Sequence, residues 1–199
     1  MNKNISMYGL PEKVEFCSKC VMTNQRPRSV VEFRNITNKK NGLDINTETK
    51  ICEACSYNLT KNQIDWNERE KQLIELLEKH RKPSGYDCIV PGSGGKDSAY
   101  TAHVLKYKYG MNPLTVTWAP HMYTDIGWQN FDNWIKKGGF DNILFTPNGK
   151  VHELLTSLSF KNLLHPFQPF IIGQKIIGPL LAKKLEIPLI FYGENQAEY

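Results

Sequence analysis

The residues best suited to chemistry form a short run between an apolar segment and a helix-like segment. The run reads Ser93, Gly94, Gly95, Lys96, Asp97 and Ser98. Glycines let a backbone approach phosphate oxygens closely, and a helix that begins after such a bend directs its free N–H groups at the same spot. Lys96 adds a point positive charge, the two serines add hydroxyl donors, and Asp97 could hold a Mg²⁺ that the phosphates share. The run therefore predicts a phosphate-binding bend.

Two common phosphate-binding motifs do not match this bend. A Walker A motif requires Ser or Thr after its Lys and a Gly five residues before its second Gly. Here Asp97 follows Lys96, and Val90 holds the other position. A dinucleotide-binding motif requires a further glycine where Asp97 stands. The structural alternative is an ordinary strand–helix turn in which Asp97 only caps the helix.

Four cysteines form two Cys-x-x-Cys pairs, Cys17 with Cys20 and Cys52 with Cys55. Two such pairs provide the tetrahedral sulfur set that zinc prefers. Residues 21–51 lie between the pairs, a loop longer than the usual ~15–20 residues, although extra loop length costs little entropy. Redox dithiols or an iron–sulfur cluster are the alternatives. Because neither pair is predicted to sit between a strand and a helix, as a thioredoxin-like motif would, we predict a structural Zn²⁺ site.

Composition limits the kind of protein this is. The chain has 199 residues, 40% of them hydrophobic, and a formal net charge of +5. That apolar content is enough for a packed core, and the scattered Lys and Arg suit an anionic ligand without requiring nucleic acid. No apolar run reaches the roughly 20 residues of a membrane helix, and the N-terminus lacks the apolar core of a signal peptide. We therefore expect a cytoplasmic protein with no membrane span.

The elements that must position these residues change in character along the chain. Residues 1–62 are short of aliphatic side chains and are predicted to be a zinc-ribbon region. A helix capped by Asp65 is predicted within residues 63–85, which link this region to an α/β domain over 86–199. We expect Trp66, Trp128 and Trp134 to be core residues, and the lone Cys88 to be a small buried side chain.

The α/β domain follows from strands that alternate with helices. Strands are predicted over 86–91, 113–120, 142–147 and 187–193, and helices over 98–109, 126–137 and 171–185, with a further helix that carries Val151, Leu154, Leu155 and Leu158. Such alternation predicts a doubly wound parallel sheet covered on both faces. Since doubly wound sheets usually have about five or six strands, we expect the domain to be incomplete at its C-terminus.

The bend at Ser93–Ser98, placed after a buried strand, resembles the PP-loop of the ATP pyrophosphatase superfamily. This resemblance implies an adenine nucleotide α-hydrolase-like sheet and cleavage of ATP between its α- and β-phosphates. By the same resemblance the bend grips the departing pyrophosphate, the cofactors are ATP and Mg²⁺, and Lys96 and Asp97 are the catalytic residues, with Asp97 as a magnesium ligand.

Several further segments resemble the N-acetyl sugar amidotransferases of bacterial surface-polysaccharide synthesis, a group that includes pseudaminic acid amidotransferases. The segments are CSKCVMTNQRP, ICEAC, IDWNERE, YDCIVPGSGGKDS, LTVTWAPHMYTDIG, NLLHPFQPFIIGQK and YGEN. The likeness runs from about Cys17 to Tyr199 and covers the N-terminal half to two thirds of the family's members.

The family resemblance implies a definite reaction. The enzyme would adenylate the acetamido group of an N-acetyl sugar, release AMP and pyrophosphate, and replace the oxygen with ammonia to give an acetamidino sugar. The product would serve lipopolysaccharide, O-antigen, capsule or flagellin-glycan biosynthesis. The ammonia would come from a separate glutamine amidotransferase partner that resembles the glutaminase and cyclase subunits of histidine synthesis.

Weaker candidate residues lie after the predicted strands. Glu194 and Asn195 follow the fourth strand at its carboxyl end, where open α/β sheets bind ligands, and are predicted to bind the nucleotide. His121 and Asp125 follow the second strand, and His165 and Gln168 lie in a proline-bounded loop. His121 and Asp125 could contact ATP, metal or sugar, or only cap local structure, and His165 could contact substrate or be simply solvated. The remaining histidines, His80, His103 and His152, lie on predicted helices and are given no role.

Two other functions remain open. A PP-loop tRNA thiolation enzyme also pairs the SGGKDS run with Cys-x-x-Cys motifs, although this chain lacks a dense basic patch with aromatic residues for RNA. A non-catalytic zinc-ribbon and nucleotide-binding assembly subunit is the other reading.

Overall fold

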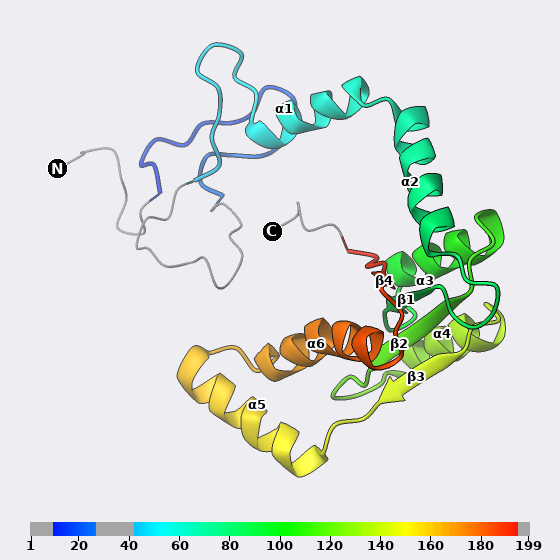
Figure 1. Ribbon diagram of the computed structural model, residues 1–199. Helices are drawn as coiled ribbons and strands as arrows, with labels where there is room; N and C mark the ends of the chain where they lie inside the picture. Colours follow the sequence, from blue (N-terminus) through cyan, green and yellow to red (C-terminus); the bar gives the residue numbers. More distant parts are fainter. Residues whose placement is uncertain (1–9, 27–41, 195–199) are drawn as a thin grey trace. The chain divides into compact units, whose positions relative to one another are not determined.

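The computed structural model describes residues 10–26 and 42–194 (Figure 1). These residues fall into two compact units, one that ends at Arg69 and one that begins at Glu70. Helix α2 (Trp66–His80) spans this boundary in the sequence. It begins where the sequence predicts, because the Asp65 carboxylate accepts hydrogen bonds from the backbone N–H groups of Asn67 and Glu68, both at 3.0 Å.

Residues 10–26 and 42–69, the described part of the first unit, contain little regular structure. Two isolated antiparallel bridges pair Phe16 with Thr23 and Ile45 with Cys52. Helix α1 (Glu53–Thr60) and the 3₁₀-helix η2 (Lys61–Gln63) follow the second bridge. Within residues 10–26 and 42–69, the buried hydrophobic side chains are Cys17 and Cys52. In this described part of the unit, sulfur atoms therefore occupy the place of an apolar core.

The second unit contains a parallel sheet of four strands, which confirms the predicted α/β class. The strands are β1 (Cys88–Pro91), β2 (Pro113–Trp118), β3 (Asn142–Phe145) and β4 (Leu189–Ile190). Their order is β3-β2-β1-β4, and every pairing is parallel. The fourth strand is shorter than predicted, at two residues. The carboxyl ends of all four strands consequently lie along one edge of the sheet.

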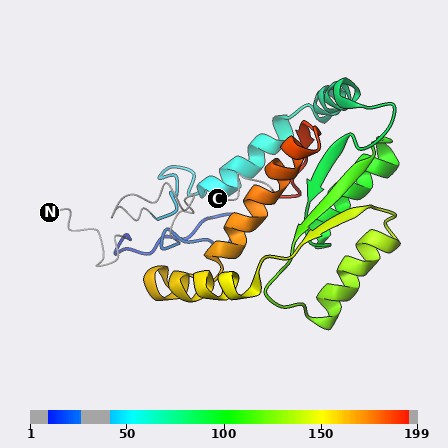
Figure 2. The same cartoon turned by 60° about the horizontal axis from the view of Figure 1, so that its bottom comes forward.

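Helices cover both faces of this sheet. Helices α3 (Lys96–His103) and α4 (Asp125–Lys136) lie on one face, and α6 (Gln168–Lys184) lies on the other (Figure 2). The sequence of β1 accounts for helices on both faces, because successive side chains in a strand point to opposite faces and those of β1 are apolar on each. Cys88 and Val90 pack with Leu105 and Trp134, whereas Ile89 packs with Ile177 of α6.

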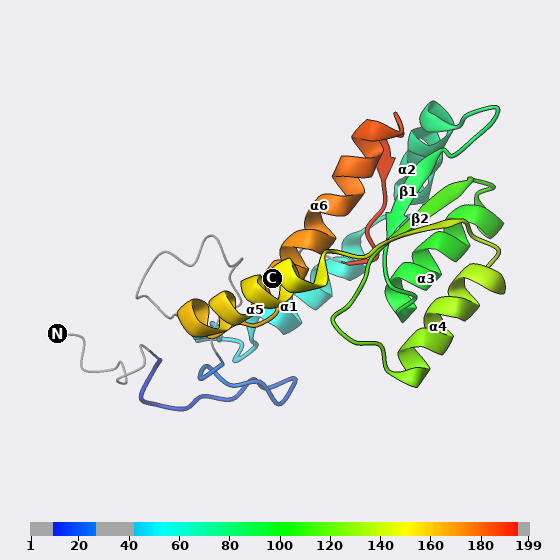
Figure 3. The ribbon, with the colours of Figure 1, turned by 90° about the horizontal axis from the view of Figure 1, so that it is seen from below.

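Helix α5 (Gly149–Leu163) precedes α6 and lies to the side of the sheet (Figure 3). Its apolar side chains, Val151, Leu154, Leu155 and Leu158, are all exposed. The half-buried positions of its sequence include His152, Thr156 and Ser159 instead. Among the described helices, none has the length and hydropathy needed to cross a bilayer.

Two details differ from the sequence-based expectation. The helix predicted over 98–109 begins at Lys96, and its second half, η3 (Val104–Lys108), has π-helical hydrogen bonding before Gly110 ends it at φ 64°. Of the three tryptophans expected in the core, Trp134 is buried, but Trp66 and Trp128 are 62% and 49% exposed. Trp66 opens α2, outside the cluster that packs against the sheet, and Trp128 packs at an edge against Tyr123.

A buried carboxylate ties the start of β1 to the start of β2. Asp87 is 2% exposed and accepts hydrogen bonds from the backbone N–H groups of Lys82, at 2.8 Å, and Asn112, at 2.9 Å. The Asp87 N–H in turn donates to the Asn112 carbonyl at 3.1 Å. The two parallel strands therefore enter the sheet from a common hydrogen-bonded junction.

We expect Asp87→Ala to lower the free energy of unfolding by about 2–4 kcal/mol, because it leaves two backbone donors without an acceptor. Urea unfolding followed by circular dichroism measures the change. Glu75→Ala, at an exposed position of α2, is the control and should change stability by less than about 0.5 kcal/mol. Equal stability of the two variants would contradict a structural role for Asp87.

Candidate functional site

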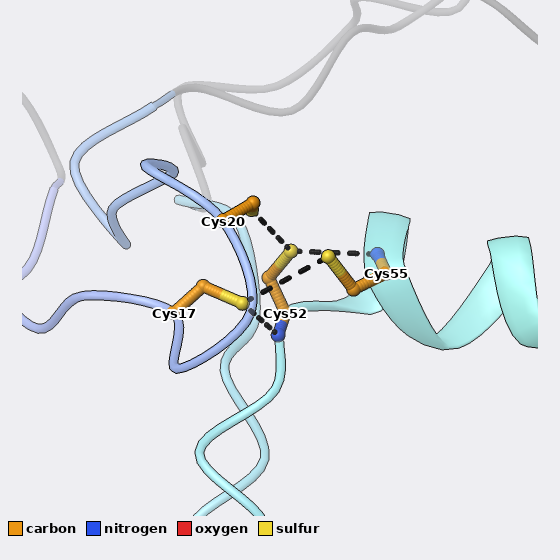
Figure 4. Close-up of side chains that lie close together, drawn as sticks. All are labelled: Cys17, Cys20, Cys52 and Cys55. Carbon is orange, nitrogen blue, oxygen red and sulfur yellow. Dashed lines mark hydrogen bonds between the residues drawn. The ribbon is translucent and has the colours of Figure 1, made fainter.

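The first candidate site is the cluster formed by the four predicted zinc ligands. Cys17, Cys20, Cys52 and Cys55 place their Sγ atoms within 4.8 Å of one another (Figure 4). Cys17 Sγ lies 3.9 Å from Cys55 Sγ, and Cys20 Sγ lies 3.7 Å from Cys52 Sγ. A tetrahedral zinc site with Zn–S bonds of ~2.3 Å has edges of ~3.8 Å. All four thiols are free, so their spacing fits one metal ion such as zinc.

Backbone hydrogen bonds hold the four sulfurs in place. The Cys17 N–H donates to the Met22 carbonyl at 2.9 Å and closes the first turn. Cys52 is the N-cap of α1, where its sulfur accepts from the Cys55 N–H at 3.5 Å. The second pair thus spans the start of α1, with Cys52 as its cap and Cys55 inside it. Only an isolated bridge at Cys52 precedes the helix, so the pair does not sit between a strand and a helix. The two pairs are joined, because the Cys52 N–H donates to Cys17 Sγ at 3.2 Å, and a single redox dithiol needs no such convergence.

The thiols of this cluster have unequal proton affinities. The pKa of Cys17 falls to about 6, chiefly because the Cys52 N–H donates to its sulfur. The pKa of Cys55 rises to about 12, chiefly through its side-chain interaction with Cys20 and then through burial. A bound cation would favour the thiolate form of each sulfur, since metal binding releases thiol protons. By contrast, Cys88 lies alone in β1, where burial raises the pKa of its thiol to about 12, as expected for a packing residue.

The second candidate site is the glycine bend between β1 and α3. Gly94 has φ 82°, and a Cβ there would lie 2.9 Å from the Phe131 Cα atom of α4. A Cβ on Gly92 would meet the Ser98 side chain. Gly95 differs from both, because its φ is −65° and a Cβ there would meet only Ser93 Oγ, at 3.9 Å. Packing and backbone conformation thus explain why positions 92 and 94 are glycines, but they do not explain Gly95, which has open space where a side chain would lie.

The bend presents several backbone N–H groups that make no hydrogen bond to another described residue. Among the described residues, none accepts a hydrogen bond from the backbone N–H groups of residues 93–98. Gly95 is the N-cap of α3 and offers no side-chain cap. Asp97 lies at the second position of the helix, so it is not the cap that the ordinary-turn alternative requires. The Ser98 hydroxyl turns back to donate to the Gly95 carbonyl at 3.1 Å, and the side chains of Ser93, Lys96 and Asp97 are exposed.

The chain after β4 returns to the same bend. A Cβ on Gly193 would lie 2.7 Å from the backbone carbon of Asp97 and 2.7 Å from the Ser98 nitrogen. The next residue is Glu194, and its predicted role in nucleotide binding stays a prediction. Sequence reasoning did not single out Gly193 itself. Asn195 lies outside the described residues. Asp125 is the first residue of α4, and the preceding residue, Thr124, caps this helix: its hydroxyl oxygen accepts a hydrogen bond from the Gly127 N–H at 3.0 Å.

A cluster of rings lies beyond the carboxyl end of β2. His121 contacts His152 of α5 and Phe170 of α6, with ring centroids 4.6 Å and 5.5 Å apart. Trp118, the last residue of β2, stacks on Phe145 at 4.8 Å and faces His152 at 6.4 Å. The sequence analysis predicted His121 as a candidate site residue but assigned no role to His152. His165 and Gln168 lie at the junction of α5 and α6, so the structure brings both of these candidates to the same two helices.

Comparisons with known proteins leave the family open. No family model matches the chain. A protein of Methanocaldococcus jannaschii, described as uncharacterized, is 39% identical over 74 residues, which cover 36% of this chain and 26% of that protein. The chain thus spans about a quarter of the length of the curated relative that it matches.

We expect the purified protein to carry about one zinc per chain, and Cys52→Ala to lose most of it, because three thiolates make a poorer structural site than four. Inductively coupled plasma mass spectrometry measures the metal content. Cys88→Ala is the matched cysteine control and should keep its zinc. Full zinc in Cys52→Ala, or loss of zinc in both variants, would contradict the four-cysteine site.

If the bend binds Mg²⁺–pyrophosphate, as its sequence predicts, Gly193→Ala should weaken this binding at least about 10-fold, equivalent to about 1.4 kcal/mol. The added methyl group would press on the backbone of α3 at the donors of the bend. Isothermal titration calorimetry measures the affinity. Gly149→Ala is the control, since a Cβ there meets nothing within 4 Å. Unchanged affinity in Gly193→Ala would show that the chain after β4 does not shape the anion site.

Proposed function

We propose that the second unit is a PP-loop-type ATP-binding unit that adenylates the acetamido group of an N-acetyl sugar and replaces its oxygen with ammonia. The observation that carries this function is the bend itself. The backbone N–H groups of residues 93–98 have no acceptor among the described residues. Position 95 is a glycine although neither packing nor backbone conformation requires one there, which leaves space for a ligand beside it. Such a bend at a helix N-terminus suits the phosphates of a nucleotide.

The exposed side chains of the bend suit pyrophosphate departure. Lys96 would neutralise charge on the phosphates, and Asp97 would hold the Mg²⁺, which supplies further charge neutralisation when bound. An acetamide carbonyl is a poor electrophile, so transfer of AMP to its oxygen creates a good leaving group that ammonia can displace. This chemistry depends on positioning and electrostatic stabilisation, and it needs no covalent nucleophile in the protein.

Glu194 follows β4, which pairs directly with β1, and it would lie at the edge of the nucleotide site. The first unit would act as a structural zinc ribbon. We further propose that ammonia comes from a glutamine amidotransferase partner, and that the protein works in the cytoplasm, where ATP is available and thiols stay reduced. The acetamidino product would enter surface-polysaccharide or flagellin-glycan synthesis.

We expect AMP and pyrophosphate release from Mg²⁺–ATP to require both an N-acetyl sugar and ammonium chloride. N-acetylglucosamine and its UDP-linked form are the sugar probes, and chromatography quantifies AMP. Lys96→Ala should lower the rate roughly 100-fold, because it removes a charge aimed at the leaving group. Lys184→Ala, an exposed Lys at the end of α6, is the matched control and should retain the full rate.

Other outcomes would identify the other functions. AMP release that requires bulk tRNA and a sulfur donor, and not sugar, would replace the amidotransferase with a tRNA thiolation enzyme. ATP binding without AMP release on any substrate would favour a non-catalytic assembly subunit.

A further inference from the structure

The ring cluster beyond β2 holds a histidine whose orientation is fixed from several sides. His121 Nε2 lies 3.2 Å from the Thr156 hydroxyl of α5. The His121 ring also contacts the rings of His152, at 4.6 Å, Phe167, at 5.9 Å, and Phe170, at 5.5 Å. His121 remains exposed. Two helices thus hold an imidazole that stays accessible to a ligand.

The cluster shares the ligand-binding edge of the sheet with the glycine bend. Strands β1 and β2 are parallel, and the Gly92 N–H donates to the Val116 carbonyl at 2.9 Å, so the bend and the segment after Trp118 leave the same edge. That segment carries both His121 and Tyr123. The Tyr123 ring lies 6.2 Å from that of Phe131, whose backbone abuts Gly94. One short segment therefore runs from the ring cluster to the wall of the bend.

His152 is suited to support an imidazole that gains a proton. Its pKa is lowered, first by burial and then by the charge of His121. Its Nε2 atom is buried and has no hydrogen-bond partner among the described residues. A neutral His152 adds no positive charge beside His121 and presents a polarisable ring to it.

We propose that His121 is the proton acceptor of the ammonia step, and that Thr156 and His152 are positioning residues that hold its ring. When the Nε2–H group donates to the Thr156 hydroxyl, the lone pair of Nδ1 is available to the reacting nitrogen. The role presupposes the proposed amidotransferase activity, because it concerns the second half of that reaction.

The proton balance of the reaction requires such an acceptor. The acetamide oxygen attacks the α-phosphorus of ATP, the bond to the bridging oxygen breaks, and pyrophosphate leaves. Ammonia then adds its lone pair to the carbon of the O-adenylated imidate, whose nitrogen keeps the amide proton and carries a positive charge, and becomes a cationic substituent. One proton passes from this nitrogen to His121 Nδ1. The carbon–oxygen bond breaks with its electron pair on AMP, the amidinium forms, and His121 returns its proton to water.

Two measurements on the same full chain separate the half-reactions. Sugar-dependent exchange of labelled pyrophosphate into ATP reports adenylation, and mass spectrometry of the acetamidino product, with UDP-N-acetylglucosamine and ammonium chloride, reports the ammonia step. His121→Gln should keep the exchange within about threefold and lose product formation about 100-fold or more, as expected for a lost general base. Added imidazole should restore part of the rate. His103→Gln, an exposed histidine on α3, should leave both reactions unchanged.

Thr156 supplies a second and milder test, should the first variant fail to fold. Thr156→Val removes the hydroxyl at nearly constant shape and should slow only product formation, by about 10-fold, while Thr156→Ser restores it. Unchanged product formation in His121→Gln, or equal loss of exchange and product, would overturn the role of His121. A wild-type chain that shows no sugar-dependent exchange would instead overturn the amidotransferase function, and this role with it.

Discussion

Close backbone contact around the first turn of α3 is the constraint on which the second unit depends. Three separate parts of the chain meet there without room for a side chain. Gly94 abuts the backbone of α4, Gly92 abuts Ser98, and Gly193 abuts the backbone of residues 97–98. These contacts fix the direction of α3 relative to β1 and β4. The backbone N–H groups of residues 93–98 meanwhile have no hydrogen-bond acceptor among the described residues.

The first unit depends on a different interaction. Within residues 10–26 and 42–69 its buried hydrophobic side chains are cysteines, in contrast to the apolar clusters that cover both faces of the sheet. Four sulfurs within 4.8 Å of one another would instead be joined by a metal ion, and the free energy of metal binding would serve as folding energy. The two units thus illustrate two ways of ordering a chain: one by burying alternate faces of a strand, the other by chelation.

Much of this architecture could be predicted from sequence because it follows local rules. Alternating strands and helices gave the parallel sheet, Asp65 marked the start of α2, and the spacing of the cysteines marked the sulfur cluster. The features that could not be predicted depend on tertiary contacts. Nothing local shows that Trp66 stays exposed, that Gly193 abuts α3, or that Cys52 caps a helix. A glycine that is required by a neighbour distant in sequence looks the same as one required by a turn.

The sequence of helix α5 explains why the ring cluster could not be predicted. Its apolar residues follow a helical spacing that would ordinarily mark the face turned toward a core, and such a pattern draws attention away from the polar residues between them. In the structure the apolar side chains are exposed, while His152 and Thr156 contact the ring of His121. Placing polar side chains on the protected side of a helix contributes little to packing, and local rules that fail in this way tend to fail at functional sites. The inverted polarity of α5 is therefore a reason, independent of any reaction, to look for a ligand at the carboxyl end of β2.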